Sequence, residues 1–176
     1  MPDLQTIEKV KQMKLLLAQH IGWFNSKNSL AHFTIFEFFE DDIKEDTFCL
    51  QLDRIASEIN TFNVQCDAFD WFDNGAFYIK PNEVSANKMS ELMKQILKES
   101  TQIKKSIINT NPHVSIARKL SPEKLEIAQQ LFTNINLEFA VRNLTLRKFD
   151  EKLKQFTLYK EFPLIGKPKE IQGSLF

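Results

Sequence analysis

The chain has 176 residues, of which 43% are hydrophobic, and its 23 basic residues balance its 23 acidic residues. Zero net charge gives no general attraction to a long polyanion, which disfavours long duplex nucleic acid and favours a small or terminal phosphate ligand. The length supports one hydrophobic core and is short for two, so residues 1–176 are expected to form a single domain.

The first half of the chain predicts helices and strands in alternation. Two segments carry apolar residues at helical intervals, and two others are rich in aromatic and β-branched residues or alternate in polarity as strands do. The expected elements are a helix over 4–19, a strand over 30–39, a helix over 46–60 and a strand over 62–71. Asp3 is placed to cap the first helix, and His32 falls within the first strand.

The second half begins with a hairpin. The turn sequence Asp-Asn-Gly at 73–75 joins the preceding strand to a strand over 76–80. Further along, the pattern predicts a helix over 83–101, a strand over 114–117 that begins at His113, a helix opened by Ser121-Pro122-Glu123, and strands over 137–149 and 155–162. Helices interspersed with mostly antiparallel strands indicate the α+β class.

Two parts of the chain share one design, in which a helix, a strand with a histidine, a second helix and a hairpin follow one another. The first helix opens at Pro2-Asp3 ahead of His32, and its counterpart opens at Pro81-Asn82 ahead of His113. The spacing from helix start to histidine is nearly the same in both parts, which indicates an internal duplication. A pseudo-twofold arrangement of the two copies would bring the two histidines around one point.

Two of the three histidines begin the same four-residue pattern of histidine, apolar residue, hydroxyl residue and apolar residue. The copies are His-Phe-Thr-Ile at 32–35 and His-Val-Ser-Ile at 113–116. In a strand, residues two apart point to the same face, so each histidine shares a face with the hydroxyl of Thr34 or Ser115. His20 ends a helix without this pattern and is expected to take no part in catalysis.

Two imidazoles on opposite sides of one phosphate suit the displacement of a phosphodiester oxygen. His32 and His113 would act as the acid and the base, in an order that the sequence leaves open, and an unperturbed pKa of about 6.5 suits both roles near neutrality. Thr34 and Ser115 would hydrogen-bond the non-bridging oxygens. The scheme requires no metal ion or other cofactor, since the histidines serve proton transfer and no cluster of three or four ligands remains.

The two motifs and the elements around them resemble the 2H phosphoesterase superfamily, which includes 2'-5' RNA ligase-like proteins and 2',3'-cyclic nucleotide phosphodiesterases. The resemblance covers nearly the whole chain. It implies two pseudo-symmetric lobes of mostly antiparallel sheet, with helices outside and a cleft between them. It also implies metal-independent opening of a 2',3'-cyclic phosphate on a nucleotide or RNA end to a 2'-phosphate, with 2'-5' ligation as the reverse reaction.

Several residues near the motifs can have either a functional or a structural role. The resemblance makes Arg118 a candidate phosphate contact, because a basic residue is common at that place in the family; alternatively it is a solvated charge after a strand. Four strand aromatics either stack on a base or pack in the core: Phe36, Trp71, Phe77 and Tyr78. The domain as a whole can also be a module that binds nucleotides or RNA ends without turnover, which an assay on 2',3'-cyclic nucleotides would distinguish.

A comparison of the two copies predicts a gap in the first. A strand over 76–80 directly precedes Pro81, whereas only Met1 precedes Pro2. The resemblance likewise implies an apolar strand before the first helix, so we expect the first strand to be missing from this chain. An open sheet edge recruits another strand. We therefore expect a repair by the segment over 162–176, self-association with a second molecule, or a gap in the sheet.

The chain contains no pattern typical of secretion or membrane insertion. Charged residues occur every few positions at the N-terminus, and no apolar run approaches the roughly 18 residues of a membrane span. Cys49 and Cys66 lack metal-ligand spacing and form a poor disulfide framework. We therefore expect a reduced, cytoplasmic protein that does not bind membranes.

Overall fold

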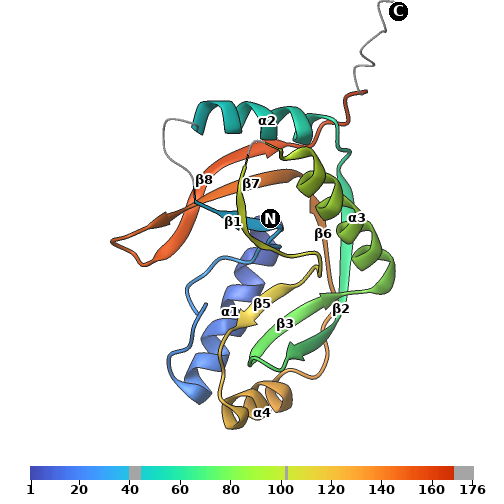
Figure 1. Cartoon of the computed structure of the whole chain (residues 1–176). Helices are drawn as coiled ribbons and strands as arrows, with labels where there is room; N and C mark the ends of the chain where they lie inside the picture. Colours follow the sequence, from blue (N-terminus) through green and yellow to red (C-terminus); the bar gives the residue numbers. More distant parts are fainter. Residues whose placement is uncertain (40–44, 102, 169–176) are drawn as a thin grey trace, which may run out of the picture.

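The structure, a computed structural model, describes residues 1–39, 45–101 and 103–168 (Figure 1). Within these residues the helices are α1 (Leu4–Ile21), α2 (Glu45–Ser57), α3 (Glu83–Glu99) and α4 (Pro122–Leu131). The strands are β1 (Phe36–Phe38), β2 (Phe62–Phe72), β3 (Ala76–Pro81), β4 (Lys105–Ile108), β5 (Val114–Ala117), β6 (Leu137–Val141), β7 (Asn143–Asp150) and β8 (Gln155–Pro163). No helix in the described part of the chain is long and apolar enough to cross a membrane.

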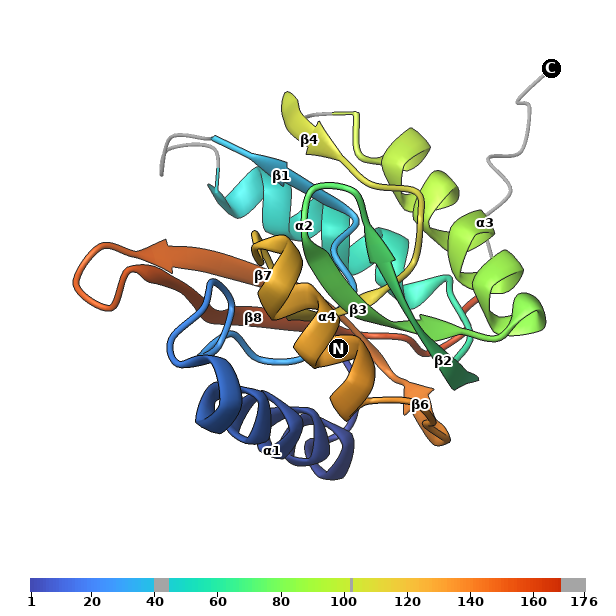
Figure 2. The same ribbon diagram turned by 90° about the horizontal axis from the view of Figure 1, so that it is seen from below.

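The strands form three antiparallel sheets. Four strands make one sheet in the order β5-β3-β2-β6, and two smaller sheets pair β1 with β4 and β7 with β8. The β7–β8 hairpin extends to one side of the molecule, as the view from below shows (Figure 2). Helix α2 packs on β7 and β8 at one end, and α1 packs on α4 at the other (Figure 1). The molecule thus has the mixed α+β architecture that the sequence predicts.

Matching helix caps support the internal duplication. The Asp3 side chain accepts a hydrogen bond of 2.8 Å from the backbone N–H of Thr6 at the start of α1. Asn82 accepts one of 2.9 Å from the backbone N–H of Ser85 at the start of α3. In both copies a buried proline precedes the cap and a buried hydroxyl residue donates the backbone N–H. Helices α1 and α3 therefore occupy equivalent places in the two copies.

Differences from the expected elements arise where a strand requires a partner. The expected strand over 30–39 forms only at Phe36–Phe38, where β1 pairs with β4, a strand that the sequence did not predict. His32 therefore lies in an irregular segment, because a run of aromatic and β-branched residues indicates burial but does not supply a neighbouring strand. The expected strand over 137–149 is two strands, since β6 pairs with β2 and the chain then changes sheets at Arg142 to pair β7 with β8.

A cavity of about 640 Å³ lies beside the irregular segment over 31–35, called here the His32 segment. In the four-stranded sheet, β3 lies between β5 and β2 and pairs with both. In the other copy, the His32 segment corresponds to β5. Strand β7 corresponds to β2, because the number of residues from the start of β2 to the start of β7 equals the number from His32 to His113. The place that corresponds to β3 therefore lies between the His32 segment and β7. The cavity occupies that place.

Residues of the His32 segment, β1 and β7 line the cavity together with apolar side chains of α2 and α3. Among the described residues, this cavity lies between the His32 segment and β7. The described part of the C-terminal tail forms backbone hydrogen bonds with Arg142, Ile59 and Ser57. The rest of the tail, residues 169–176, lies outside the described residues.

Candidate active site

His32 lines this cavity with one ring nitrogen fixed by the backbone. Its Nδ1 lies 2.6 Å from the carbonyl oxygen of Leu30, two residues earlier. A carbonyl oxygen only accepts, so Nδ1 carries the proton and Nε2 keeps its lone pair. The preceding loop is anchored by the buried Lys14 of α1, whose Nζ donates to the carbonyl oxygens of Ser26 and Ser29 at 3.0 and 2.7 Å.

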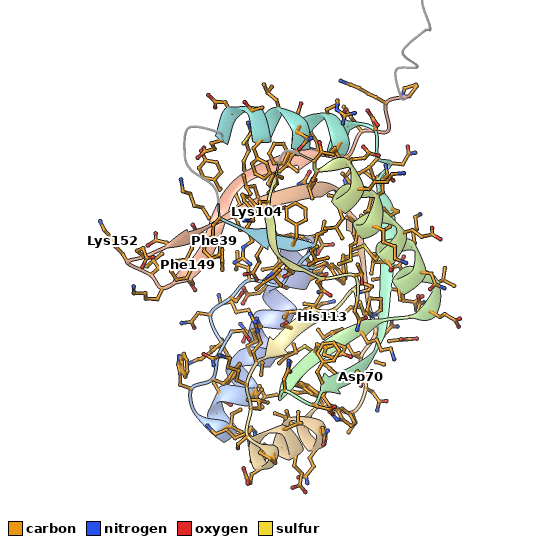
Figure 3. All side chains as sticks on the ribbon, in the orientation of Figure 1. Phe39, Asp70, Lys104, His113, Phe149 and Lys152 are labelled. Atoms are coloured by element: carbon orange, nitrogen blue, oxygen red, sulfur yellow. The ribbon has the colours of Figure 1, made fainter. Side chains whose placement is uncertain are left out.

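His113 repeats this geometry immediately before β5. Its Nδ1 lies 2.8 Å from the carbonyl oxygen of Asn111, again two residues earlier. The ring packs against Tyr78 and Phe72, with centroid separations of 5.0 and 5.4 Å. Figure 3 shows His113 near the middle of the molecule. Both motif histidines thus present Nε2 as the nitrogen that can exchange a proton.

Hydrogen bonds hold the two motif segments side by side. At one end the backbone N–H of Arg118 donates to the carbonyl oxygen of Asn25 at 3.1 Å. Beside it, the hydroxyl of Ser26 donates to the carbonyl oxygen of Ile116 at 3.1 Å. At the other end the backbone N–H of residue 109 donates to the carbonyl oxygen of residue 35 at 2.9 Å. The chain over 25–35 therefore runs antiparallel to the chain over 109–118.

These contacts obey the pseudo-twofold symmetry of the duplication. When the copies are aligned with His32 on His113 and each residue is replaced by its counterpart, the contact of residues 25 and 118 becomes one of residues 106 and 37. The structure pairs Glu37 with Ile107. In the same way, the hydrogen bond between residues 26 and 116 predicts a contact between residues 107 and 35. The structure has a backbone hydrogen bond between residues 109 and 35. The two motifs are therefore related by a local twofold, accurate to one or two residues.

The other expected site residues accompany these histidines. Thr34 lines the same cavity as His32, and Ser115 lies in β5 opposite Tyr78; both hydroxyl residues are half-buried. Arg118 is exposed, and its positive charge lowers the pKa of His113. The hydrogen bonds described for the two imidazoles are with separate backbone carbonyl groups.

Arg147 of β7 also belongs to this site. Its Nη1 lies 2.9 Å from Nδ1 and 3.1 Å from Nε2 of His32. Its Nη2 donates to the carbonyl oxygen of Phe156 on β8. No pattern in the sequence distinguishes Arg147 from other strand arginines. Lys14 did carry a signal, because it stands among Val10, Leu17 and the other apolar residues that α1 buries.

Burial and positive charge make both histidines weak bases in the free protein. Burial lowers the pKa of His32 to about 3, helped by the positive charges of Arg147 and Lys14 and opposed by the hydrogen bond to the Leu30 carbonyl. Burial also lowers the pKa of His113. Both rings are therefore predominantly neutral near pH 7, which a proton acceptor requires.

The remaining candidates have simpler surroundings. His20 is exposed at the end of α1, in agreement with its exclusion from the site. Of the four aromatic residues with two interpretations, Phe77 and Tyr78 are buried and Phe36 lines the cavity. Trp71 remains 48% exposed on β2. Core packing therefore explains Phe77.

Comparisons with known proteins agree with this fold. A crystal structure of TT0787 of Thermus thermophilus matches with a TM-score of 0.60 and 16% identity, covering 92% of this chain and 94% of that chain. A crystal structure described as a phosphoesterase matches with a TM-score of 0.57 and 14% identity, covering 89% and 91%. A search of curated protein sequences found no match. A family model described as "2'-5' RNA ligase superfamily" matches residues 5–153, which include both histidine motifs. The chain therefore belongs to the 2'-5' RNA ligase superfamily of 2H phosphoesterases.

Proposed function

We propose that this protein opens 2',3'-cyclic phosphates of nucleotides or RNA ends by metal-independent acid–base catalysis. The observation that carries the proposal is the matched geometry of His32 and His113. In each ring the Nδ1–H donates a hydrogen bond to the carbonyl oxygen two residues earlier, which leaves Nε2 as the nitrogen for proton exchange. Two equivalent imidazoles on motifs related by a local twofold suit a reaction in which a proton leaves one side of a phosphate and another arrives on the opposite side.

In this reaction water attacks the phosphorus and passes a proton to Nε2 of one histidine. The bond between phosphorus and the 3' oxygen breaks, and that oxygen receives a proton from Nε2 of the other histidine, which leaves a 2'-phosphate. Both histidines are neutral in the free protein, as the base requires. The negative charge of the bound phosphate supports the protonated form of the histidine that serves as the acid. The same steps with a 5' ribose hydroxyl as the attacking group in place of water give a 2'-5' phosphodiester, which is ligation.

The hydroxyls of Thr34 and Ser115 would hydrogen-bond the non-bridging oxygens, where negative charge must be stabilised. Arg118 would supply a further positive charge to the side of His113, whose pKa it already lowers. Zero net charge over the whole chain favours a short or terminal substrate over a long duplex.

The test measures turnover of the four 2',3'-cyclic nucleotides by chromatography. His32→Ala and His113→Ala should each lower turnover at least about a hundredfold, because general acids and bases contribute about that much or more. His20→Ala is the matched control and should retain wild-type turnover. Wild-type rates in either motif variant would refute the mechanism. Binding of the nucleotides without any turnover by the wild-type protein would instead support the non-catalytic binding module.

A further inference from the structure

Arg147 lies against the ring of His32, whose Nε2 the proposed reaction requires. Its Nη1 is 2.9 Å from Nδ1 and 3.1 Å from Nε2, so it contacts both ring nitrogens. In the free protein a cation therefore lies beside the imidazole, where its charge opposes protonation of the ring.

Beside the His32 ring, Arg147 uses only part of its hydrogen-bonding capacity. Its Nη2 is bound to the carbonyl oxygen of Phe156, which fixes the guanidinium to the β7–β8 hairpin. Its Nε–H is buried and has no hydrogen-bond partner in the described part of the protein. A buried N–H without a partner is costly, and a guanidinium binds phosphate oxygens with strong, charge-assisted hydrogen bonds.

Positive charges gather around this end of the cavity. Lys14 of α1 acts on His32 in addition to Arg147. Two cationic side chains beside a neutral imidazole attract an anion, and water screens them less than it screens surface charges because Lys14 is buried and Arg147 is half-buried. This end of the cavity therefore has the electrostatics of a phosphate site.

We propose that Arg147 is a phosphate-binding residue that moves from the His32 ring to the substrate phosphate. This inference rests on the proposed function and adds a residue from outside both histidine motifs. The incoming phosphate accepts hydrogen bonds from the guanidinium, and the positive charge then leaves the imidazole, which accepts a proton more readily. Binding of the substrate phosphate is thereby coupled to proton transfer by His32.

The test follows the His32 ring by NMR while inorganic phosphate is added. In the wild-type protein, phosphate should shift the His32 ring signals and raise the pKa of His32, because a cation leaves the ring and an anion arrives. Arg147→Met should raise the pKa of His32 without phosphate and increase the Kd for phosphate at least about tenfold. Arg142→Met is the matched control, since Arg142 is an exposed arginine just before β7, and it should leave both quantities unchanged.

A folded Arg147→Met variant with wild-type phosphate affinity would overturn the proposal. If this variant does not fold, Arg147→Lys preserves the charge and most of the stem but lacks Nε–H and the planar fork. It should bind phosphate more weakly than the wild type, and equal affinity would also overturn the proposal. Wild-type protein whose His32 responds to phosphate but that opens no cyclic nucleotide would refute the proposed function alone. Turnover that survives unchanged in Arg147→Met would refute the role of Arg147 alone.

Discussion

Acid should destabilise this protein through His32, by an amount that follows from its pKa. The folded protein holds the pKa of His32 at about 3, chiefly through burial, whereas an unfolded histidine titrates near 6.5. Between these values the unfolded chain binds a proton that the folded chain does not. The contribution of His32 to the free energy of unfolding is therefore complete above about pH 6.5 and falls as the pH decreases toward 3. At about 1.4 kcal/mol per unit, the loss from pH 6.5 to pH 4 is about 3 kcal/mol.

The perturbation is His32→Asn, because an asparagine amide can still donate to the Leu30 carbonyl but does not titrate. Urea unfolding from pH 7 to pH 4 gives the free energy of unfolding of each protein. The wild type should lose about 3 kcal/mol more than His32→Asn over this range. His20→Asn is the control and should follow the wild type, since His20 is exposed. The three proteins differ only at these histidines, so parallel curves for the wild type and His32→Asn would refute the assigned burial and charge environment of His32.

Three further predictions concern the site and the hairpin that supports it. Thr34→Ala and Ser115→Ala should each weaken binding of phosphate or sulfate, measured by calorimetry, and should lower turnover less than the loss of a motif histidine; a greater loss would make a hydroxyl the principal catalytic group. EDTA should leave turnover unchanged, because the motifs use their histidines for proton transfer, and activity that depends strictly on added metal would contradict the scheme. Gly75→Ala should lower the free energy of unfolding by more than about 1 kcal/mol in a urea titration, since Gly75 has a φ of +76° and an added Cβ would lie 2.2 Å from the Leu120 carbonyl oxygen. An unchanged midpoint would contradict that packing.

The sequence by itself determined the features that depend on neighbours a few residues away. Asp3 and Asn82 cap α1 and α3 because each side chain reaches a backbone N–H three residues on. The motif pattern likewise predicted a matched pair of histidines, and the contact that fixes each ring is with a carbonyl only two residues earlier. The spacing of these features along the chain was enough to indicate the duplication and the family resemblance.

The tertiary structure alone decided which distant groups reach the site. Arg147 lies 115 residues after His32 and contacts it only because β7 faces the His32 segment across the cavity. The same long-range arrangement leaves the His32 segment irregular, since a strand requires a hydrogen-bonded neighbour and residue composition cannot supply one. The depressed pKa of His32 also comes from the tertiary fold, because burial and the charges of Arg147 and Lys14 depend on three elements meeting in space. Local hydrogen bonds can be predicted from sequence spacing, whereas burial and charge at one point in space depend on the packing of the whole chain.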